Sequence, residues 1–396
     1  MYFDNAATSL IKPACLAGAY EEIIRSGKYG NPSRSGHLKS QNTMLAILES
    51  RKAIADLFHI DNPMDVAFCQ NATFGLNFLI KSLVTPENHV ITSLSDHNSV
   101  LRPLYLSGCQ LSFMDIGKDL EVNYSDLEKY LQKNTRFVIT NHASNLLANL
   151  NDLDRIHAFC KEHNLIMIID MAQTAGSMDI DLSKYDRSLF VMTGHKSLYG
   201  PSGAGFIIKN GDFDFKTVFC GGSGTNSFSK VGPSTFPAIF EVGTSNYIDQ
   251  IAIKSSIDFL KIEGLDKLHK KLIGLSQGFY DGIKDIEGIK IYSKRPTLHN
   301  STALVSFNLG KINSSDLALE LEEDYGIEVR PGAHCAPLIH KKFGTVDQGM
   351  IRFSFSYFNS FEEIKQAINA IDQISKTLRN RTLKGSLSNG VGGHFA

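Results

Sequence analysis

Short apolar runs that end in polar residues recur through the first half of the chain. They lie at Val66–Cys69, Val90–Thr92, Phe137–Thr140, Leu165–Ile169, Leu189–Met192 and Gly205–Ile208. Apolar residues at helical spacing separate several of these runs, as at Asp152–His163, and also precede them at Leu16–Arg25 and Met44–Phe58. Strands that are apolar on both faces and alternate with helices are typical of a largely parallel sheet. The pattern therefore predicts an α/β fold with a mainly parallel, seven-stranded sheet.

The pattern changes after Gly243. Helical stretches follow at Tyr247–Leu260, Lys267–Ile283, Ser315–Tyr325 and Glu362–Leu378. Two strands lie between them, at Ala303–Leu309 and Met350–Ser356. This mixture predicts a smaller α+β domain. We expect a large domain at residues 13–245, a small domain made of residues 1–12 and 246–380, and a disordered tail at 381–396, which is rich in Gly and Ser and has no period.

Composition excludes several classes of protein. No apolar run approaches the ~18 residues of a membrane span, and the net charge of −1 comes from scattered charges without a basic stripe for nucleic acid. The six cysteines form no CxxC pair, which indicates free thiols in a reducing compartment and no zinc site. The start of the chain has no basic segment followed by an apolar one, so we expect no secretory signal and a cytoplasmic location.

Polar residues follow the predicted strands at the points where the strands end. These residues are Thr73, His97, Asn145, Asp170 and the group Thr193–Lys196. In open α/β sheets, ligands bind at the carboxyl ends of the strands. We therefore expect the polar residues to meet around one ligand.

Lys196 and Asp170 indicate which ligand this is. Lys196 ends a polar turn after a buried strand and precedes a Gly/Pro/Ser loop, so burial would favour the neutral amine that Schiff-base chemistry needs. Asp170, at the previous strand end, would keep the pyridine nitrogen of pyridoxal 5'-phosphate (PLP) protonated, and Gln173 would donate to the ring oxygen. Singly, the lysine also fits a solvated charge and the aspartate a turn cap. Together they predict PLP carried by Lys196.

The phosphate of PLP would lie where a strand leads into a helix. Thr73, with Ala72 before it, opens such a helix, which is a place for backbone N–H groups to bind phosphate, although a plain helix cap also explains the threonine. Thr193 and His195 would supply two further donors beside the lysine.

Two strand-end residues would contact the flat ring or the substrate. His97 either stacks on the ring or bonds to the backbone, and Asn145 either hydrogen-bonds the ring oxygen or the substrate or belongs to a turn. Both interpretations stay open for each residue.

Cys335 lies in a Gly/Pro loop with positive neighbours. Arg330, His334 and His340 flank it, and such a setting favours the reactive thiolate. On the following strand, Arg352 would offer a two-pronged fork to a substrate carboxylate, or form a structural salt bridge.

These motifs resemble those of the class V aminotransferase family of fold-type I PLP-dependent transferases, and within it the cysteine desulfurase and selenocysteine lyase branch. The resemblance covers residues 1 to about 378. The segments that carry it are DNAATS, NATFGLN, SDHNS, HASN, DMAQ, TGHKSLYGPSG, VGTSN, RPGAHCAP and IRFSFSYFN.

The resemblance implies a role for each matching residue. It implies a catalytic Lys196, a stacking and catalytic His97, and a Cys335 that takes up sulfur. It also implies cofactor contacts from Ala72, Thr73, Asn145, Asp170, Gln173, Thr193, His195 and Thr244, and substrate contacts from Asn145, Arg330 and Arg352. Thr244 matches a threonine that reaches the neighbouring subunit's phosphate, so a homodimer with shared active sites is expected.

The resemblance thus implies a PLP-dependent cysteine desulfurase. It would convert L-cysteine to L-alanine, hold the sulfur on Cys335 as a persulfide, and pass it to an acceptor protein. Two alternatives remain at this point: a selenocysteine lyase or other C–S or C–Se lyase, and a sulfur-carrier scaffold with little turnover. The complete set of Lys196, Asp170, Arg352 and Cys335 argues against the scaffold.

Overall fold

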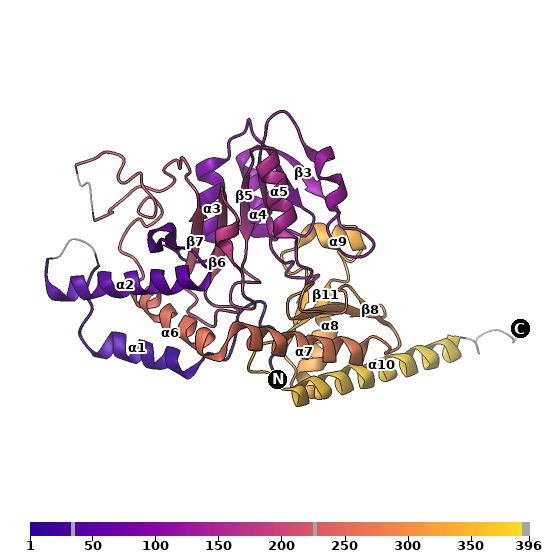
Figure 1. Cartoon of the computed structure of the whole chain (residues 1–396). Coiled ribbons are helices and arrows are strands. Elements are labelled where there is room, and N and C mark those ends of the chain that lie inside the picture. The colour runs from indigo at the N-terminus through magenta and orange to yellow at the C-terminus, as the bar shows by residue number, and fades with distance from the viewer. Residues whose placement is uncertain (33–35, 225–227, 390–396) are drawn as a thin grey trace, which may run out of the picture.

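Two sheets with helices around them form the structure (Figure 1). The computed structural model describes residues 1–32, 36–224 and 228–389. Within these ranges, a seven-stranded sheet forms the large part of the molecule and a four-stranded sheet the smaller part. No helix in the described ranges is long and apolar enough to span a membrane.

The large sheet confirms the predicted architecture. Its strands are β1 (Val66–Cys69), β2 (His89–Ser93), β3 (Gln110–Met114), β4 (Thr135–Asn141), β5 (Ile166–Asp170), β6 (Ser188–Thr193) and β7 (Gly205–Asn210). They lie in the order β1-β7-β6-β5-β4-β2-β3. Only β7 runs against its neighbours, β6 and β1, and all other pairs are parallel. The carboxyl ends of the other strands therefore share one edge.

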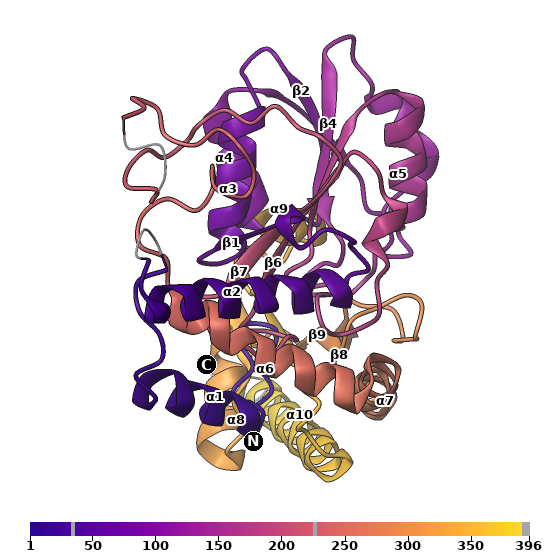
Figure 2. The ribbon, with the colours of Figure 1, turned by 60° about the vertical axis from the view of Figure 1, so that its left-hand side comes forward.

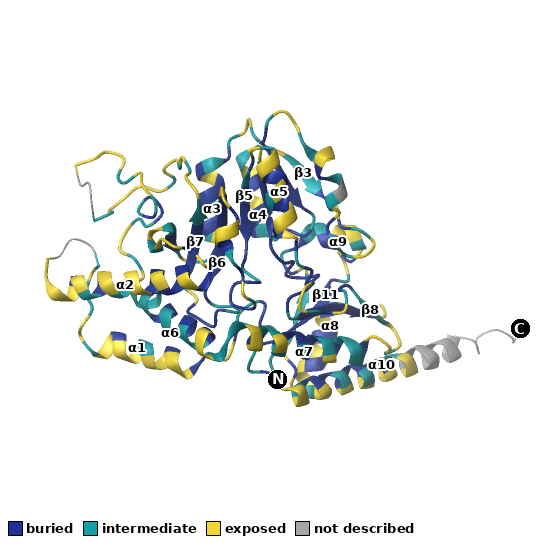
Figure 3. Cartoon of the chain, in the orientation of Figure 1, coloured by how far each residue is buried: buried dark blue, intermediate teal, exposed yellow. Residues whose placement is uncertain are grey.

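Helices cover both faces of this sheet (Figure 2). One face carries α3 (Ala72–Leu83) and α4 (Asn98–Ser107), and the other carries α2 (Leu38–Leu57), α5 (Leu153–Glu162) and α6 (Tyr247–Glu263). Along β5, Met167 and Ile169 enter one core while Ile168 enters the other, as expected for side chains that alternate between faces. Both layers exclude water from the inner strands β4, β5 and β6, which are almost wholly buried in Figure 3, whereas the edge strand β3 is mostly half-buried.

Helix α6 packs onto the large part of the molecule. Its residues Ile253, Ile257 and Leu260 belong to the core between the large sheet and α2. The core of the large part therefore extends past residue 245, where we expected the small domain to begin.

The small sheet is antiparallel, in the order β10-β11-β9-β8. Its strands are β8 (Ile289–Ile291), β9 (Leu304–Leu309), β10 (Arg330–Gly332) and β11 (Met350–Ser354), and α7 (Leu265–Ile283), α8 (Ser314–Tyr325) and α10 (Phe361–Asn389) pack around it. The N-terminal segment adds to this part: the Phe3 N–H donates to the Glu328 carbonyl, and the Ser354 N–H donates to the Phe3 carbonyl. The remaining elements are α1 (Ala14–Arg25), α9 (Pro337–Phe343) and short 3₁₀ helices at Pro63–Asp65, Tyr124–Tyr130 and Leu182–Lys184.

Several elements were not predicted. The short strands β3, β8 and β10 and the helices α4 and α9 have too few residues or too mixed a pattern to show a clear period. The last helix continues to Asn389 instead of ending near Leu378, and the rest of the expected tail, 390–396, lies outside the described residues.

The small core depends on a cluster of phenylalanines beside the strand that carries Arg352. Phe353 is fully buried on β11, with its ring centroid 4.5 Å from that of Phe279 and 5.5 Å from that of Phe3. We predict that Phe353→Ala lowers the free energy of unfolding by about 3–5 kcal/mol in urea denaturation, because it leaves a cavity. Phe361→Ala, at a position 53% exposed, should change it little. Equal losses in the two variants would contradict this account of the core.

Candidate active site

The predicted strand-end residues do meet in one place. A cavity of about 470 Å³ lies at the shared carboxyl edge of the large sheet. Nine predicted site residues line it: Ala72, Thr73, His97, Asn145, Asp170, Gln173, Thr193, His195 and Lys196. The sequence analysis missed seven others: Thr8, Asn71, Ser99, Asn141, Ala143, Ala172 and Ser202.

Lys196 lies in the turn that follows β6 and is partly buried. The pKa of this amine is lowered to about 8: burial is the main cause, the charge of Asp170 opposes the shift, and the positive charges of Arg352 and Arg330 add to it. A substantial fraction of the amine is therefore neutral near pH 8, as a nucleophile or a base requires.

Asp170 ends β5 and is 6% exposed. Burial raises the pKa of its carboxyl group, whereas the Ala172 N–H, 2.9 Å from Oδ1, and the charge of Lys196 lower it. A buried carboxylate of this kind is stabilised by a cation placed beside it. Gln173 follows on the same turn, and its Nε2 donates to the Ala6 carbonyl at 3.2 Å.

The start of α3 forms one end of the cavity. Asn71, not Thr73, caps the helix: its Oδ1 accepts from the Phe74 N–H at 3.0 Å. Gly75 lets the helix lie close to β6, because a Cβ at this position would come within 2.7 Å of the Val191 side chain. The helix start therefore presents its N–H groups to an anion beside Thr193, whose buried Oγ1 has no partner among the described residues.

The hydroxyl of Thr73 has a different role from the predicted cap. Its Oγ1 lies 2.7 Å from Ser99 Oγ, at the start of the next helix. His195 lies opposite on the lysine turn, and burial and the charge of Lys196 lower the pKa of its imidazole to about 4. His195 is therefore neutral at pH 7.

His97 caps α4 and has a fixed tautomer. Its Nδ1 accepts from the Ser99 N–H at 3.0 Å, so in the neutral ring the proton is on Nε2. Burial, and then the charge of Lys196, lowers the pKa of this imidazole to about 4, which keeps it neutral at pH 7. His97 thus bonds to the backbone and also lines the cavity, so the two alternatives for this residue are compatible.

Cys335 lies in a short, strained turn between β10 and α9. His334 and Cys335 both have left-handed backbone conformations, with φ of 51° and 55°, which costs free energy in residues other than glycine. Two hydrogen bonds hold the turn: the Asn98 N–H donates to the Cys335 carbonyl at 2.8 Å, and Asn145 Nδ2 donates to the His334 carbonyl at 2.7 Å. The half-buried cysteine is thereby attached to two of the strand ends around the cavity.

The histidines near Cys335 do not supply the positive charge that we expected. His334 and His340 are 3% and 2% exposed. Burial lowers the pKa of His334 well below its ordinary value and also lowers the pKa of His340. Both rings are therefore neutral at pH 7, and the positive charge around this loop comes from Arg330 and Arg352, which lie directly opposite each other on β10 and β11.

Arg352 is 1% exposed and only partly satisfied. Its Nη2 donates to Asp4 Oδ1 at 2.7 Å and its Nη1 to the Asn145 carbonyl at 3.0 Å, while its buried Nε has no partner among the described residues. Burial lowers the pKa of the guanidinium to about 10, against the effect of Asp4. A salt bridge and an unused donor edge thus occur in the same side chain.

The N-terminal segment belongs to this site, although the sequence showed only an extended lead-in. Thr8 Oγ1 and Ser9 N donate to the His195 carbonyl at 3.2 and 3.0 Å, and Ser9 Oγ lies 3.1 Å from the Lys196 carbonyl oxygen. Only the resemblance of the DNAATS motif gave a signal for this placement.

Thr244 lies outside the lysine cavity. It is exposed and lines another cavity, of about 420 Å³, together with aromatic residues such as Phe74 and Phe219. Within one chain it therefore does not contact the predicted phosphate site.

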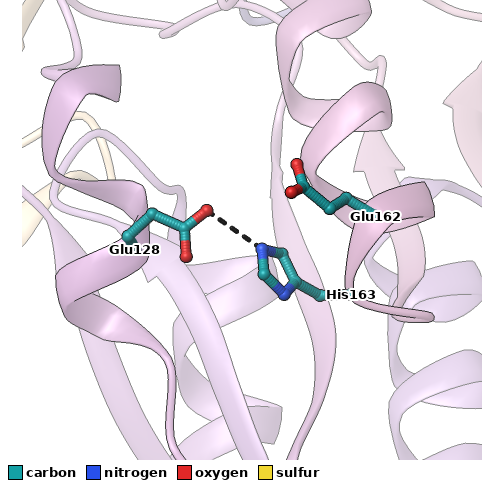
Figure 4. A group of neighbouring side chains, drawn as sticks. All are labelled: Glu128, Glu162 and His163. Carbon is teal, nitrogen blue, oxygen red and sulfur yellow. Dashed lines mark hydrogen bonds and ion pairs between the residues drawn. The ribbon is translucent and has the colours of Figure 1, made fainter.

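One group of carboxylate and imidazole side chains has the spacing of metal ligands (Figure 4). Glu128, Glu162 and His163 lie at the surface, and His163 Nε2 is 2.9 Å from Glu128 Oε1. None of them lines the lysine cavity, and the contacts of the imidazole are those of an ordinary surface ion pair.

The residues around the cavity fit PLP. Asp170 offers a carboxylate for the pyridine nitrogen, the start of α3 and the unpartnered Thr193 hydroxyl offer donors for the phosphate, and Lys196 offers a partly neutral amine for the aldehyde. The arrangement is that of an enzyme that uses PLP on amino-acid substrates.

Comparisons with known proteins agree with this interpretation of the site. The family model for class-V aminotransferases matches residues 1–367. A probable cysteine desulfurase of Pyrococcus abyssi is 29% identical over 394 residues, covering 96% of this chain and 95% of the relative. The apo structure of the cysteine desulfurase from Thermococcus onnurineus NA1 is 28% identical, with a TM-score of 0.87 over 95% of both chains. A C-DES variant with glycine covalently linked to its PLP cofactor is 20% identical, with a TM-score of 0.80 over 94% of this chain and 96% of that chain, which shows likeness of fold alone.

This chain belongs to the class-V aminotransferase family. The family is PLP-dependent, in accordance with the residues around the cavity. The predicted family and fold are thus confirmed.

The lowered pKa of Lys196 leads to a pH prediction. Below about pH 8, the rate at which the apoprotein takes up PLP should rise about tenfold for each pH unit, because only the neutral amine attacks the aldehyde. Above about pH 8 the rate should level off. Stopped-flow absorbance at several pH values measures this, and borohydride reduction followed by peptide mapping identifies the modified lysine. Lys196→Ala should retain no reducible adduct, whereas the surface variant Lys254→Ala should behave as wild type. A rate that does not change with pH would contradict the account of this amine.

Proposed function

We propose that this protein is a cysteine desulfurase that converts L-cysteine to L-alanine and takes the sulfur onto Cys335. The observation that carries the proposal is the strained turn around the half-buried Cys335, which is hydrogen-bonded to Asn98 and to Asn145, a residue that lines the predicted PLP cavity. A transaminase needs no such thiol. The printed names of the relatives, cysteine desulfurases, support the same reaction.

Substrate binding is assigned to Arg352 and Asn145. The free Nε edge of Arg352 would take the substrate carboxylate, and Arg330 on the neighbouring strand adds positive charge. The Asn145 side chain also has a buried acceptor oxygen without a partner among the described residues, which would accept an N–H from the substrate. Asn145 lines the cavity, and Arg352 is hydrogen-bonded to the Asn145 carbonyl.

Proton removal is assigned to Lys196. When bound, PLP withdraws electrons from the substrate Cα and makes its proton acidic. Lys196 has an amine that burial keeps partly neutral, so it can accept that proton. Asp170 would hold the pyridine nitrogen of PLP in its protonated form, and Nε2–H of His97 can donate a proton within the cavity.

Sulfur transfer is assigned to Cys335. Its thiolate attacks the sulfur of the substrate, a new S–S bond forms, and the Cβ–S bond of the substrate breaks. The electron pair of the broken bond stays with Cβ, which takes up a proton and becomes the methyl group of alanine. The products are alanine and a persulfide on Cys335, so atoms and electrons balance without an external oxidant.

We also propose that the protein works as a homodimer and passes its persulfide to a separate acceptor protein. The dimer is supported by Thr244, which is exposed beside an apolar patch on α2. Met44, Leu45 and Leu48 form the patch, and they share a cavity of about 410 Å³ with Gly243 and Ser245. Exposed apolar patches of this kind mark protein interfaces.

The role of Cys335 is tested by Cys335→Ser. PLP content should stay the same, whereas alanine formation from cysteine should fall at least ~100-fold, because serine cannot accept sulfur under these conditions. Alanine formation from selenocysteine should persist, since selenium can leave without a protein thiol. Cys220→Ser, which removes an exposed cysteine, is the control and should retain full activity. Wild-type rates of alanine formation from cysteine in Cys335→Ser would refute the proposal.

The dimer is tested by Thr244→Ala. Sedimentation should show a dimer for the wild type, and the variant should release PLP about tenfold more readily at unchanged circular dichroism, because one hydroxyl contact is lost. Thr217→Ala, at another exposed threonine, should retain PLP normally. A fully active monomer would contradict the shared site.

A further inference from the structure

Both Nη atoms of Arg352 already donate a hydrogen bond, whereas Nε does not. Asp4 Oδ1 accepts from Nη2 at 2.7 Å and the Asn145 carbonyl accepts from Nη1 at 3.0 Å. These two acceptors fix the plane of the guanidinium. They leave the buried Nε as the donor without a partner among the described residues.

Asp4 is itself firmly placed. Backbone bonds from Phe3 to Glu328 and from Ser354 to Phe3 hold the N-terminal segment beside the end of β11, with distances of 2.8 and 2.7 Å. The Tyr2 hydroxyl donates to the Asp4 carbonyl at 3.1 Å. The carboxylate therefore belongs to the small sheet although it lies near the chain start, 348 positions from Arg352.

Asp4 also balances positive charge around Arg352. Arg330 and Arg352 are paired directly across β10 and β11, and no ion pair of Arg330 is present among the described residues. Asp4 is the carboxylate that faces the buried guanidinium, and it offsets the repulsion between the two cations. One positive charge remains for an incoming carboxylate.

We propose that Asp4 is a positioning residue, which holds the guanidinium of Arg352 so that its Nε edge faces the carboxylate of the amino-acid substrate. This inference deepens the proposed function and rests on its assignment of Arg352 to the substrate carboxylate.

The same N-terminal segment also holds the lysine. Four to five residues after Asp4, Thr8 and Ser9 bond to the carbonyls of His195 and Lys196. One short segment therefore links the carboxylate-binding arginine of the small sheet to the lysine turn of the large sheet. The distance between the two functional groups depends on it.

Asp4 acts on Arg352 in two opposite ways, and two variants separate them. Its oxygen anchors the guanidinium, but its negative charge competes with a substrate carboxylate. Asp4→Asn keeps the acceptor oxygen and removes the charge, so we expect affinity for L-alanine within about threefold of wild type. Asp4→Ala removes the anchor as well, and we expect about tenfold weaker binding. Asp4→Ser, whose hydroxyl is too short to reach Nη2, serves in its place if Asp4→Ala does not fold.

The measurement is a titration of the PLP-loaded enzyme, followed by the absorbance of the bound cofactor. L-alanine carries the carboxylate, and ethylamine is the same molecule without it. A positioning role predicts that Asp4→Ala weakens L-alanine alone and leaves ethylamine unchanged. Asp281→Asn, which breaks the exposed Asp281–Arg295 pair of the small domain, is the matched control and should bind both as wild type does.

Three outcomes would overturn the proposal. Equal weakening for L-alanine and ethylamine would show that Asp4 is merely structural. Unchanged or tighter L-alanine binding in Asp4→Ala would show that it is no anchor, and a loss in Asp4→Asn as large as in Asp4→Ala would show that its charge, not its anchoring oxygen, matters. Because the titration involves no desulfuration, a wild type that makes no alanine from cysteine would refute the proposed function and leave this test intact.

Discussion

The parallel pairing of β4, β5 and β6 is the constraint on which the rest of the site depends. In this register Asp170 lies between Asn141 of β4 and Val191 of β6, so the ends of three neighbouring strands come level with one another. The turns that follow carry Asn145, Gln173 and Lys196 to one cavity. A shift of one residue in any of these pairings would turn its side chains to the opposite face of the sheet.

Burial then sets the protonation of the groups at this edge. It lowers the pKa of Lys196 to about 8 and the pKa of His97 to about 4, so the lysine is partly neutral and the histidine fully neutral near pH 7. It also leaves Arg352 and Thr193 with buried polar atoms that have no hydrogen-bond partner among the described residues. A charged substrate and a phosphate-bearing cofactor would supply acceptors for both groups.

The small sheet completes the site through two connections. The N-terminal segment joins Asp4 and Arg352 to the lysine turn, and the Cys335 turn is tied to Asn98 and Asn145. Leu146 and Leu147 strengthen the second connection, since they belong to the same buried cluster as Ala336, which follows Cys335, and Ile339 of α9. Chemistry that needs a lysine and a cysteine from different sheets therefore rests on short, fixed segments.

The sequence predicted what is local and periodic. The apolar runs indicated the large sheet, and the polar residues at their ends indicated the cavity, because both follow from alternation along single strands. It did not predict β10, which has three residues, or the pairing of Asp4 with Arg352, which joins positions far apart in the chain. The neutrality of His334 was also missed, because adjacency in sequence says nothing about burial.

The central claim is that this edge of the sheet delivers the sulfur of cysteine to Cys335. A single turnover of the PLP-loaded enzyme with L-cysteine, followed by peptide mass mapping and alanine analysis, tests it most directly. The account predicts that the peptide containing Cys335 gains the mass of one sulfur atom for each alanine formed, while the peptides of the other five cysteines do not. Alanine released without any sulfur on Cys335 would contradict it.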